Sequence, residues 1–295
     1  MIQDLNLRIE IMKKIKYTMH TKSLRLLNRL SLIWLIIRNG AEKYLVKNFH
    51  IFVPSSAGDF KLLGFHTKIS IITIFPLLSK LLQILDIKTK IVKSNLFCKT
   101  KKKFKDSIML KKYFDKYGSD KSSVHNYHLI YGSLFKNKDR VKKVLEIGLG
   151  TDDENLISNM GKYGKPGASV RAFRDFFKKA KIYGADIDKK ILFKDRGIKT
   201  FYVDQTSIAN LDSLFRKIGK NFDLIIDDGL HAPYTNVNVI ISGLNCLKKN
   251  GWLVIEDIPF KAKPIWEVIN FIINQKHDCK LIEAKSSYVF LINKR

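Results

Sequence analysis

The sequence predicts an α/β protein built on a doubly wound, mostly parallel sheet of seven strands, preceded by a mainly helical extension. Three observations support this prediction. The stretch Lys143–Gly150 (KVLEIGLG) is a short apolar strand that runs into two glycines. Strand and helix patterns then alternate as far as Ile292, which is typical of a parallel sheet covered on both faces. Five successive strands also end in acidic residues.

The first strand has the character of a central, buried strand, because Val144, Leu145 and Ile147 are apolar and partly β-branched. Gly148 and Gly150 allow a sharp turn at which a ligand can approach the backbone. A Gly-x-Gly turn after a strand also occurs as plain turn chemistry, so this motif by itself leaves both interpretations open.

The connection that follows, Thr151–Ala168, is long and rich in Gly, Asp and Asn. Long connections inside compact domains are typically lids or binding loops, so we expect it to cover an active site. Ser169 is expected to cap a helix that ends near Phe177.

Further strands and helices follow at regular intervals. We expect a Rossmann-like arrangement, with ligands bound at the carboxyl ends of the strands. The expected strands are 181–186, 199–203, 222–226, 251–255, 280–283 and 288–292, with helices at 210–218, 234–247 and 264–274.

The region before the first strand divides into two parts. Residues 106–295 are expected to form the sheet domain, which opens with helices at 109–117 and 128–135 around a polar segment. Residues 1–105 are expected to form a basic extension. Its predicted elements are an amphipathic helix at 23–46, a short strand at 50–53, an apolar segment at 69–85 broken at Pro76, and a charged linker at 99–105.

The chain is strongly basic, with 54 Lys and Arg against 27 Asp and Glu and a net charge of +27. Such an excess is typical of proteins that bind nucleic acid or acidic membranes, but a lysine-rich coding bias has the same effect. Residues 1–112 hold 23 of the basic residues and only 6 of the acidic ones. Because so much of the excess precedes the sheet, nucleic acid is disfavoured as the partner of the site.

No segment is expected to span a membrane, because Leu24–Ile37 and Ile69–Leu78 are both shorter than the roughly 20 apolar residues required. Acidic residues near the start, Asp4 and Glu10, disfavour a signal peptide. For the helix at 23–46, packing or dimerisation is favoured over contact with a membrane surface, since an apolar stripe is usually core.

The three cysteines, Cys98, Cys246 and Cys279, are far apart and show no paired spacing. This pattern indicates a reducing compartment without a disulfide framework or a zinc site. We therefore expect a cytoplasmic protein, with the inner face of the membrane as an alternative site of attachment.

Carboxylates gather where the predicted strands end. Five strands in succession ending this way are hard to explain as helix caps, because the desolvation and mutual repulsion of the carboxylates would cost stability without a ligand. Asp186 stands where an acidic side chain accepts hydrogen bonds from a ribose. The third glycine of a dinucleotide-binding turn is missing, so a positively charged sulfonium ligand is favoured over a pyrophosphate. The acidic residues are Glu146, Asp186, Asp188, Asp204, Asp227, Asp228, Glu256 and Asp257.

Two of these strand ends predict a metal site. Asp228, Glu256 and Asp257 end strands that would be neighbours about 5 Å apart, so three carboxylates can converge on one hard cation such as Mg²⁺. His231 opens the next helix and can reach the same cavity as a general base. A histidine here can also simply satisfy a backbone carbonyl, but the adjacent carboxylates favour the functional interpretation.

The order EIGLG, YGADID, VDQTS, FDLIIDDGLH and WLVIED resembles the class I S-adenosylmethionine-dependent methyltransferases. In particular it resembles the Mg²⁺-dependent sugar O-methyltransferases of macrolide biosynthesis, the mycinamicin and tylosin type. The segments YGSDKSSVHNYHLIYGSLF and GASVRAFRDFF are similar to that family as well. The resemblance covers about residues 110–295 and leaves the extension unmatched.

The resemblance implies S-adenosyl-L-methionine and Mg²⁺ as cofactors and assigns roles to individual residues. Asp228, Glu256 and Asp257 would hold the metal, and His231 would act as the base. The residues implied in cofactor binding are Glu146, Gly148 and Gly150 at the methionine part, Asp186 at the ribose, Asp204 and Gln205 at the adenine, and Asp227, Ser169 and Arg171 around them.

The function predicted is therefore methyl transfer to a hydroxyl of a sugar, in a glycosylated natural product or a polysaccharide. One alternative is a basic nucleic-acid methyltransferase, although base-modifying enzymes do not need three carboxylates around a metal. Another is a non-catalytic, membrane-associated module of the same fold. The identity of the acceptor, the role of residues 1–105 and any assembly into a homo-oligomer stay open.

Overall fold

The computed structural model describes residues 40–56, 58–98, 100–162 and 164–295. The chain divides into two compact units, Met1–Leu77 and Leu78–Arg295. The second unit contains the sheet and begins well before residue 106, where the sequence placed the boundary.

The described part of the first unit is helical. It contains α2 (Ala41–Asn48), the 3-10 helix η1 (His50–Phe52) and the start of α3 (Phe60–Ile84). The predicted strand at 50–53 is wrong: the carbonyl of His50 accepts from the amide of Val53 at 3.2 Å, so the backbone pairs locally. Of the predicted helix at 23–46, residues 23–39 lie outside the described residues.

Helix α3 corrects two expectations. It continues through Pro76, where the sequence predicted a break, and so extends over 25 residues. A proline inside a helix removes one hydrogen bond, which the remaining turns tolerate here. By length and composition alone, α3 could cross a membrane, and only 17% of its most apolar window is buried. The expectation that no segment is long enough does not hold.

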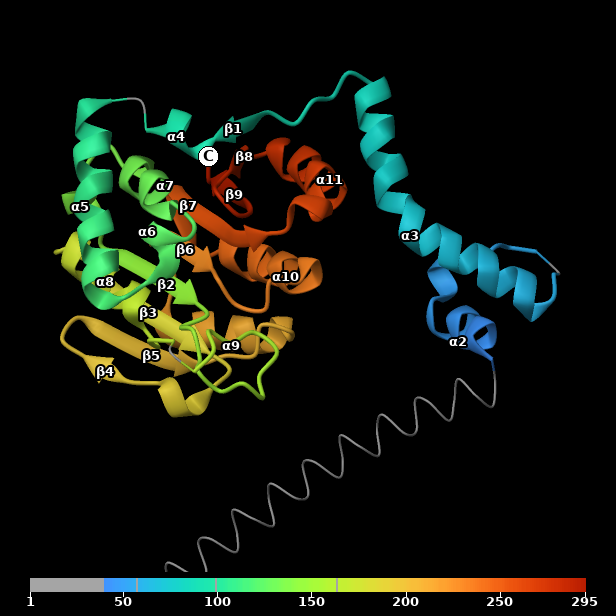
Figure 1. The fold of residues 1–295 in the computed structure, drawn as a ribbon, viewed down its shortest axis with the longest axis horizontal. Helices are drawn as coiled ribbons and strands as arrows, with labels where there is room; N and C mark the ends of the chain where they lie inside the picture. The colour runs from blue at the N-terminus through green and yellow to red at the C-terminus, as the bar shows by residue number, and fades with distance from the viewer. Residues whose placement is uncertain (1–39, 57, 99, 163) are drawn as a thin grey trace, which may run out of the picture. The chain divides into compact units, whose positions relative to one another are not determined.

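The second unit is built on one nine-stranded sheet (Figure 1). Its strand order is β1-β8-β9-β7-β6-β2-β3-β5-β4, and five adjacent strands, β7, β6, β2, β3 and β5, are parallel to one another. The strands are β1 (Ile91–Lys93), β2 (Lys143–Ile147), β3 (Lys181–Asp186), β4 (Lys194–Asp195), β5 (Ile198–Tyr202), β6 (Phe222–Asp227), β7 (Leu247–Ile258), β8 (Asp278–Glu283) and β9 (Tyr288–Asn293).

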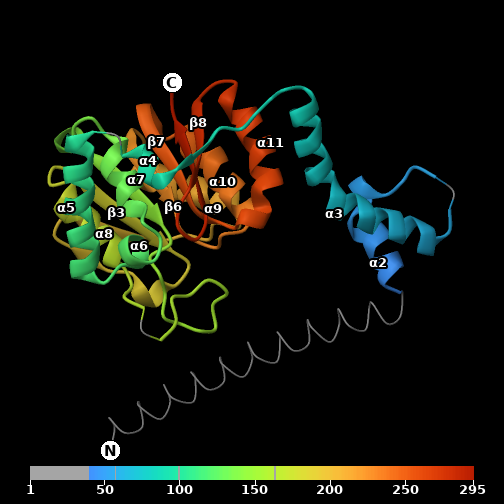
Figure 2. The ribbon, with the colours of Figure 1, turned by 45° about the horizontal axis from the view of Figure 1, so that its top comes forward.

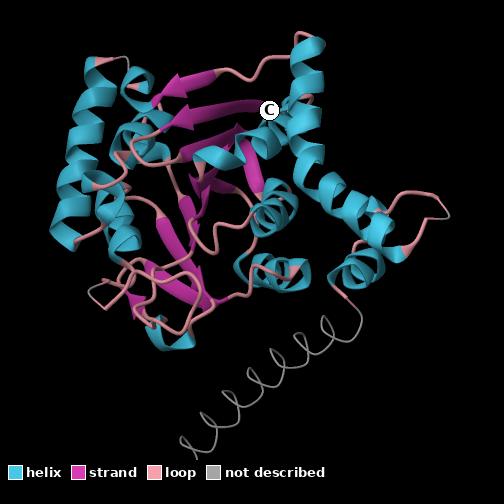
Figure 3. Ribbon diagram, turned by 45° about the vertical axis from the view of Figure 1, so that its right-hand side comes forward, coloured by secondary structure: helices cyan, strands magenta, loops and turns pink. Residues whose placement is uncertain are grey.

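Helices cover both faces of the sheet (Figure 3). Alternate residues of a strand point to opposite faces, so Val144 of β2 packs with one helix group and Leu145 with the other. The first group is α5 (Lys101–Tyr117), α7 (Tyr127–Leu134) and α8 (Ala168–Phe176); the second is α9 (Ile208–Ile218), α10 (Pro233–Leu244) and α11 (Lys263–Asn274). The doubly wound prediction is confirmed.

The strand count is nine where the sequence predicted seven. The two additional strands are β1, with three residues, and β4, with two. Each lies at an edge of the sheet, β1 parallel to β8 and β4 antiparallel to β5. Runs this short carry no periodicity, so only their partners define them as strands.

The predicted linker at 99–105 is helical from Lys101 onward, because α5 begins there. The side chain of Thr100 accepts a hydrogen bond from the amide of Lys103 and caps this helix. A run of lysines is compatible with a helix when one face of the helix packs, and Leu110 and Phe114 of α5 are fully buried. The short helix α6 (Asp120–Ser123) follows in the predicted polar segment.

Candidate active site

A cleft of about 600 Å³ opens at the carboxyl ends of the central parallel strands. Its walls are the turns after β2, β3, β5 and β6, the end of β7, α6 and the loop 151–167. Figure 2 shows this loop, in yellow-green, projecting beyond the strand ends. The side chain of Ser158 donates to the carbonyl of Gly229 at 2.7 Å and so ties the loop to the turn after β6.

The glycine turn after β2 has room for glycine only. Gly148 has φ +94°, and a Cβ there would lie 2.0 Å from the carbonyl oxygen of Asp228. Gly150 has φ +75°, and its Cβ would lie 1.9 Å from Sδ of Met160. Both glycines line the cleft, so the backbone is open to a ligand at this point.

Asp186 fixes the glycine turn from the neighbouring strand. Its Oδ2 accepts from the amide of Leu149 at 2.7 Å, and its Oδ1 accepts from the amide of Asp188 at 2.8 Å. Burial raises the pKa of Asp186, while these hydrogen bonds favour the carboxylate. Asp186 lines the cleft beside the exposed side chain of Ile187, and its role at the ribose stays a prediction.

Glu146 is fully buried behind the wall of the cleft. Its Oε2 accepts from the hydroxyl of Ser169 at 2.6 Å. Its Oε1 has no hydrogen-bond partner among the residues that the structure describes. Burial raises the pKa of Glu146 to about 7.

Ser169 lines the cleft. The prediction that it caps α8 is wrong, because the N-cap of this helix is Gly167. Arg171 lies outside the cleft lining. Its guanidinium stacks 4.1 Å from the ring centroid of Phe193 and donates to the carbonyl of Pro166 at 2.9 Å. It therefore holds the end of the loop 151–167.

Asp227 is fully buried and lies behind the turn after β6. It accepts from Asn236 at 2.9 Å, from Gln205 at 3.2 Å and from the amide of Gly229 at 3.3 Å. Burial raises the pKa of Asp227 to about 6. Asp204 and Gln205 line the cleft, whereas Asp227 lies outside its lining and anchors the turn.

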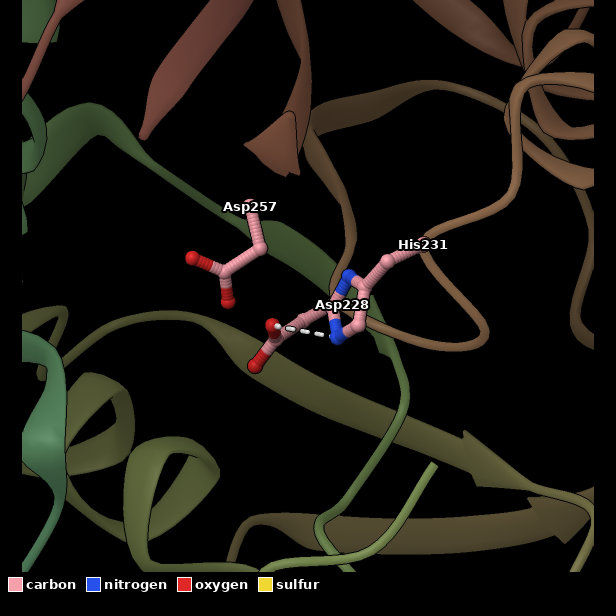
Figure 4. Close-up of side chains that lie close together, drawn as sticks. All are labelled: Asp228, His231 and Asp257. Carbon is pink, nitrogen blue, oxygen red and sulfur yellow. Dashed lines mark ion pairs between the residues drawn. The ribbon is translucent and has the colours of Figure 1, made fainter. Parts of the chain in front are cut away.

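Asp228, His231 and Asp257 converge at one side of the cleft (Figure 4). One ligand atom from each lies within 4.8 Å of the others, which is close enough to hold a metal ion. Nε2 of His231 lies 4.0 Å from Oδ1 of Asp228. Nδ1 of His231 is buried and has no hydrogen-bond partner in the described part of the chain.

The backbone is in the left-handed region at two of these residues, with φ +57° at His231 and +52° at Asp257. Non-glycine residues held there cost on the order of 1–3 kcal/mol each, and such strain is common at functional sites. At Asp257 the strain coincides with an irregularity in the β7–β9 pairing between Ile255 and Ile258. Irregularities of this kind re-aim side chains.

Glu256, the third predicted metal ligand, is fully buried and faces a different partner. Its carboxylate accepts from the hydroxyl of Tyr131 and from the ammonium group of Lys121. Burial raises its pKa, and the positive charge of Lys121 opposes that shift. Its carboxylate lies outside the group of side chains that could share an ion in this structure.

Lys121 belongs to the site although no role was predicted for it from the sequence. Its ammonium lies 2.5 Å from Oδ2 of Asp228 and 3.3 Å from Oε1 of Glu146, and it pairs with Glu256. The side chain is 3% exposed. Although burial opposes it, the three carboxylates raise the pKa of Lys121 well above its ordinary value.

Two aromatic side chains orient Asp257. The hydroxyl of Tyr127 donates to Oδ1 of Asp257 at 2.6 Å. The ring of His125 stacks on Tyr127 at 5.0 Å between centroids, and its Nδ1 lies 3.4 Å from Asp257. Burial and the charge of Asp257 raise the pKa of Tyr127, so the phenol stays a donor.

The strand order, the glycine turn and the acidic strand ends define the fold of the class I S-adenosylmethionine-dependent methyltransferases. The solved structures of MycE, a methyltransferase of the mycinamycin biosynthetic pathway, have this fold. The complex with Mg and SAH is 24% identical with a TM-score of 0.52, and the complex with Mg, SAH and mycinamycin VI is 22% identical with the same TM-score. Each match covers 63% of this chain and 54% of that one.

In sequence, the chain is similar to sugar O-methyltransferases, which confirms the resemblance given above. It is 30% identical over 153 residues to 8-demethyl-8-alpha-L-rhamnosyl tetracenomycin-C 2'-O-methyltransferase of Streptomyces olivaceus. It is 34% identical over 120 residues to mycinamicin VI 2''-O-methyltransferase of Micromonospora griseorubida.

These matches cover 52% and 39% of this chain but only 38% and 27% of the relatives. Demethylmacrocin O-methyltransferase of Streptomyces fradiae, 30% identical over 140 residues, is covered to 32%. The similarity is therefore to part of each relative. No protein-family model matches the chain.

Proposed function

We propose that this chain is an S-adenosylmethionine-dependent, Mg²⁺-assisted O-methyltransferase that acts on a hydroxyl group of a sugar, in a glycosylated natural product or a polysaccharide. The observation that carries the proposal is the convergence of Asp228, His231 and Asp257 within 4.8 Å, in the same cleft as the glycine turn and Asp186. Relatives with the same kind of sequence are named as sugar O-methyltransferases.

The cleft fits an S-adenosyl ligand. Gly148 and Gly150 line the cleft without side chains, so the backbone is bare where the ligand would pass. Asp186 offers a fixed carboxylate to a ribose. Glu146 lies behind the wall of the cleft, where its Oε1 is 3.3 Å from the ammonium group of Lys121, so it supports the wall and does not face the ligand. Bound in the cleft, S-adenosylmethionine would supply the electrophilic methyl group.

The residues around Asp228 fit a divalent cation. Carboxylate oxygens are the ligands that Mg²⁺ prefers, and Asp228 and Asp257 offer them beside the unpaired Nδ1 of His231. We also assign Glu256 to the metal as a third carboxylate. Because Glu256 and Asp228 both pair with Lys121 in this structure, this assignment requires Glu256 to exchange Lys121 for the ion. A bound divalent ion would lower the pKa of an acceptor hydroxyl and orient it.

The chain's own residues perform the remaining steps. We assign the removal of the hydroxyl proton to the imidazole of His231. Asp228, with Oδ1 4.0 Å from Nε2, stabilises the imidazolium that forms. Tyr127 holds Asp257 in place, and the tie between Ser158 and Gly229 keeps the loop against the cleft. The acceptor then faces the methyl group in a fixed geometry.

Calorimetry with S-adenosylmethionine, with and without Mg²⁺, followed by a screen of sugar acceptors, tests this proposal. We expect cofactor binding without the metal and turnover only with it. In Asp228→Ala we expect turnover to be abolished while cofactor binding persists. Full activity of that variant would remove the metal from the mechanism, and failure to bind the cofactor would refute the proposal as a whole.

The same experiments separate the two rival functions. A nucleic-acid methyltransferase would methylate RNA or DNA and bind heparin with strong salt dependence. A non-catalytic module would bind neither cofactor nor metal. The arrangement of Asp228, His231 and Asp257 favours the sugar O-methyltransferase over both, since neither rival needs these groups together.

We propose a cytoplasmic enzyme attached to the inner face of a membrane. Helix α3 supports attachment, because only 17% of its most apolar window is buried and uncovered apolar helices are unfavourable in water. The lysines on and after α3, Lys61, Lys68, Lys80, Lys88 and Lys90, are attracted to anionic lipid headgroups. Alternatively, a second copy of the chain would cover the apolar side chains of α3. Membrane contact through residues 23–46 stays a prediction.

A further inference from the structure

The ammonium group of Lys121 lies among carboxylates from the ends of three strands. Glu146 comes from β2, Asp228 follows β6, and Glu256 is in β7. The distances are 3.3 Å to Glu146 and 2.5 Å to Asp228, and the contact with Glu256 is a direct ion pair. Lys121 is placed by its own short helix, α6, whose N-cap Ser119 accepts from the amide of Lys121.

Two of these partners are proposed metal ligands. Asp228 and Glu256 each give an oxygen to Lys121, and a divalent ion would require oxygens from the same carboxylates. An ammonium and a metal ion cannot bind the same oxygens together without strong repulsion. In this structure the ammonium neutralises the charge that a metal would neutralise.

The third partner gives Lys121 a second place to bind. Glu146 does not line the cleft, and its Oε1 has no hydrogen bond from the described residues. It lies 3.3 Å from the ammonium, so a small movement of the flexible lysine side chain would exchange Asp228 and Glu256 for Glu146. Lys121 can therefore leave the metal ligands without becoming a buried, unpaired charge.

We propose that Lys121 is an internal counter-ion that competes with the divalent cation for Asp228 and Glu256 and thereby sets the metal affinity of the site. This inference rests on the proposed metal site. In the metal-free protein Lys121 holds the carboxylates together against their mutual repulsion. When a divalent cation is present, Lys121 pairs with Glu146.

The inference predicts opposite effects on stability and on affinity. Lys121→Met has nearly the same length but no charge, so it leaves the buried carboxylates of Glu146 and Glu256 and the partly exposed one of Asp228 without a cation. Buried charges that lose their partner are strongly destabilising, and the metal-free variant should unfold at a lower temperature than the wild type. Because no ammonium group then competes for the carboxylate oxygens, the variant should bind Mg²⁺ more tightly, by about tenfold or more.

Calorimetric titration with MgCl₂ in the absence of cofactor, and thermal unfolding with and without MgCl₂, test the proposal. The variants are Lys121→Met, Lys121→Gln and Lys121→Arg, and the control is Lys116→Met, an exposed lysine outside the cleft lining that pairs with Asp175. Mg²⁺ should bind more tightly to both neutral variants and restore their unfolding temperature. Lys121→Arg, which keeps the charge, should not gain affinity, and the control should stay within about twofold of the wild type.

Each result decides a different point. Equal or weaker Mg²⁺ binding by the neutral variants, with normal binding by the wild type, would overturn the inference and leave the proposed function intact. Neutral variants that fail to fold even in saturating Mg²⁺ would also overturn it, because the metal must be able to replace the ammonium. Absence of Mg²⁺ binding in every protein would overturn both the inference and the metal site.

Discussion

The hydroxyl of Tyr127 donates a hydrogen bond over 2.6 Å to Oδ1 of Asp257, a residue 130 positions further along the chain. This contact ties helix α7 to the strained backbone at the end of β7 and sets the direction of a carboxylate that is expected to bind a metal. The tie is part of a small network, since the hydroxyl of Ser287 also lies 3.2 Å from the same oxygen.

Replacing Tyr127 by Phe should weaken metal binding while the fold persists. Groups that orient a metal ligand typically contribute about 10- to 100-fold to affinity or activity, so we expect a loss of roughly tenfold in Mg²⁺ affinity by calorimetry. Tyr183→Phe is the matched control, because Tyr183 packs against Phe201 away from the cleft. Unchanged affinity in Tyr127→Phe would mean that Asp257 is held without the phenol.

Replacing His231 by Ala should lower kcat by about 10²- to 10⁴-fold, which is the usual effect of a lost general base. The dissociation constant for S-adenosylmethionine should stay within about twofold, because His231 belongs to the acceptor side of the cleft. His277→Ala, in the turn before β8, is the control and should keep full activity. A near-normal kcat in this variant would show that another group removes the proton of the acceptor hydroxyl.

Gly148→Ala should abolish cofactor binding and destabilise the second unit by several kcal/mol, since its Cβ would lie 2.0 Å from the carbonyl oxygen of Asp228. Gly161→Ala provides a matched control. Gly161 also has a positive φ, +69°, but its Cβ would meet nothing within 4 Å, so the cost is only about 1 kcal/mol of backbone strain. Chemical denaturation of both variants measures the difference, and similar losses would contradict the close packing of the turn.

His128 should make the protein less stable in mild acid. Its side chain is 6% exposed, and burial lowers its pKa to about 4, below its ordinary value of about 6.5 in an unfolded chain. A depressed pKa contributes stability that is present above pH 6.5 and is lost as the pH falls through 4. The loss builds up between pH 6.5 and pH 4, and the difference of about 2.5 between the two pKa values corresponds to roughly 3 kcal/mol.

Urea unfolding of the wild type and of His128→Gln at pH 7.5 and pH 4.5 measures this contribution. The wild type should lose more stability than the variant between the two values, because glutamine takes up no proton. Equal losses in the two proteins would show that His128 stays neutral or is protonated equally in both states.

Helix α3 should bind anionic vesicles. We expect the protein to sediment with vesicles that contain phosphatidylglycerol and to be released when Ile72 and Leu81, which are 58% and 49% exposed, are both replaced by Asn. The control is Ile241→Asn on α10, also exposed at 50%. If the wild type instead forms dimers in solution, does not bind vesicles, and loses the dimer in the double variant, a second copy of the chain covers the apolar side chains of α3.

The alternation of strands and helices was predictable because the strands of the central sheet are buried on both faces and are therefore continuously apolar. The turn residues Gly148, Gly150 and Asp186 were predictable for a related reason: the ends of parallel strands meet at one edge. The bounds of α9 and α11 differ from the prediction by two residues or fewer. The full length of α3 could not be predicted, because a proline such as Pro76 usually ends a helix, whereas here the helix continues on both sides of it.

The contacts between the side chains of the site could not be predicted from the sequence. Lys121 reads as a solvated lysine in a polar segment, and its carboxylate partners Asp228 and Glu256 lie 107 and 135 residues away. Glu256 and Asp257 are adjacent in β7, yet the irregularity there directs them to different neighbours, Lys121 and Tyr127. Spacing along a strand therefore predicts the edge of the sheet but not which of two neighbouring carboxylates faces a given partner.

The contact of Gly148 with the carbonyl of Asp228 also has a mechanical consequence. The amide of Asp228 donates to the carbonyl of Ile147 at 2.8 Å, so the two turns are joined by a hydrogen bond and pressed together where a side chain is missing. Neither turn can shift without pushing the other. The half of the cleft that would present the donor and the half that would receive the alcohol therefore behave as one stiff rim, and their alignment is set when the protein folds.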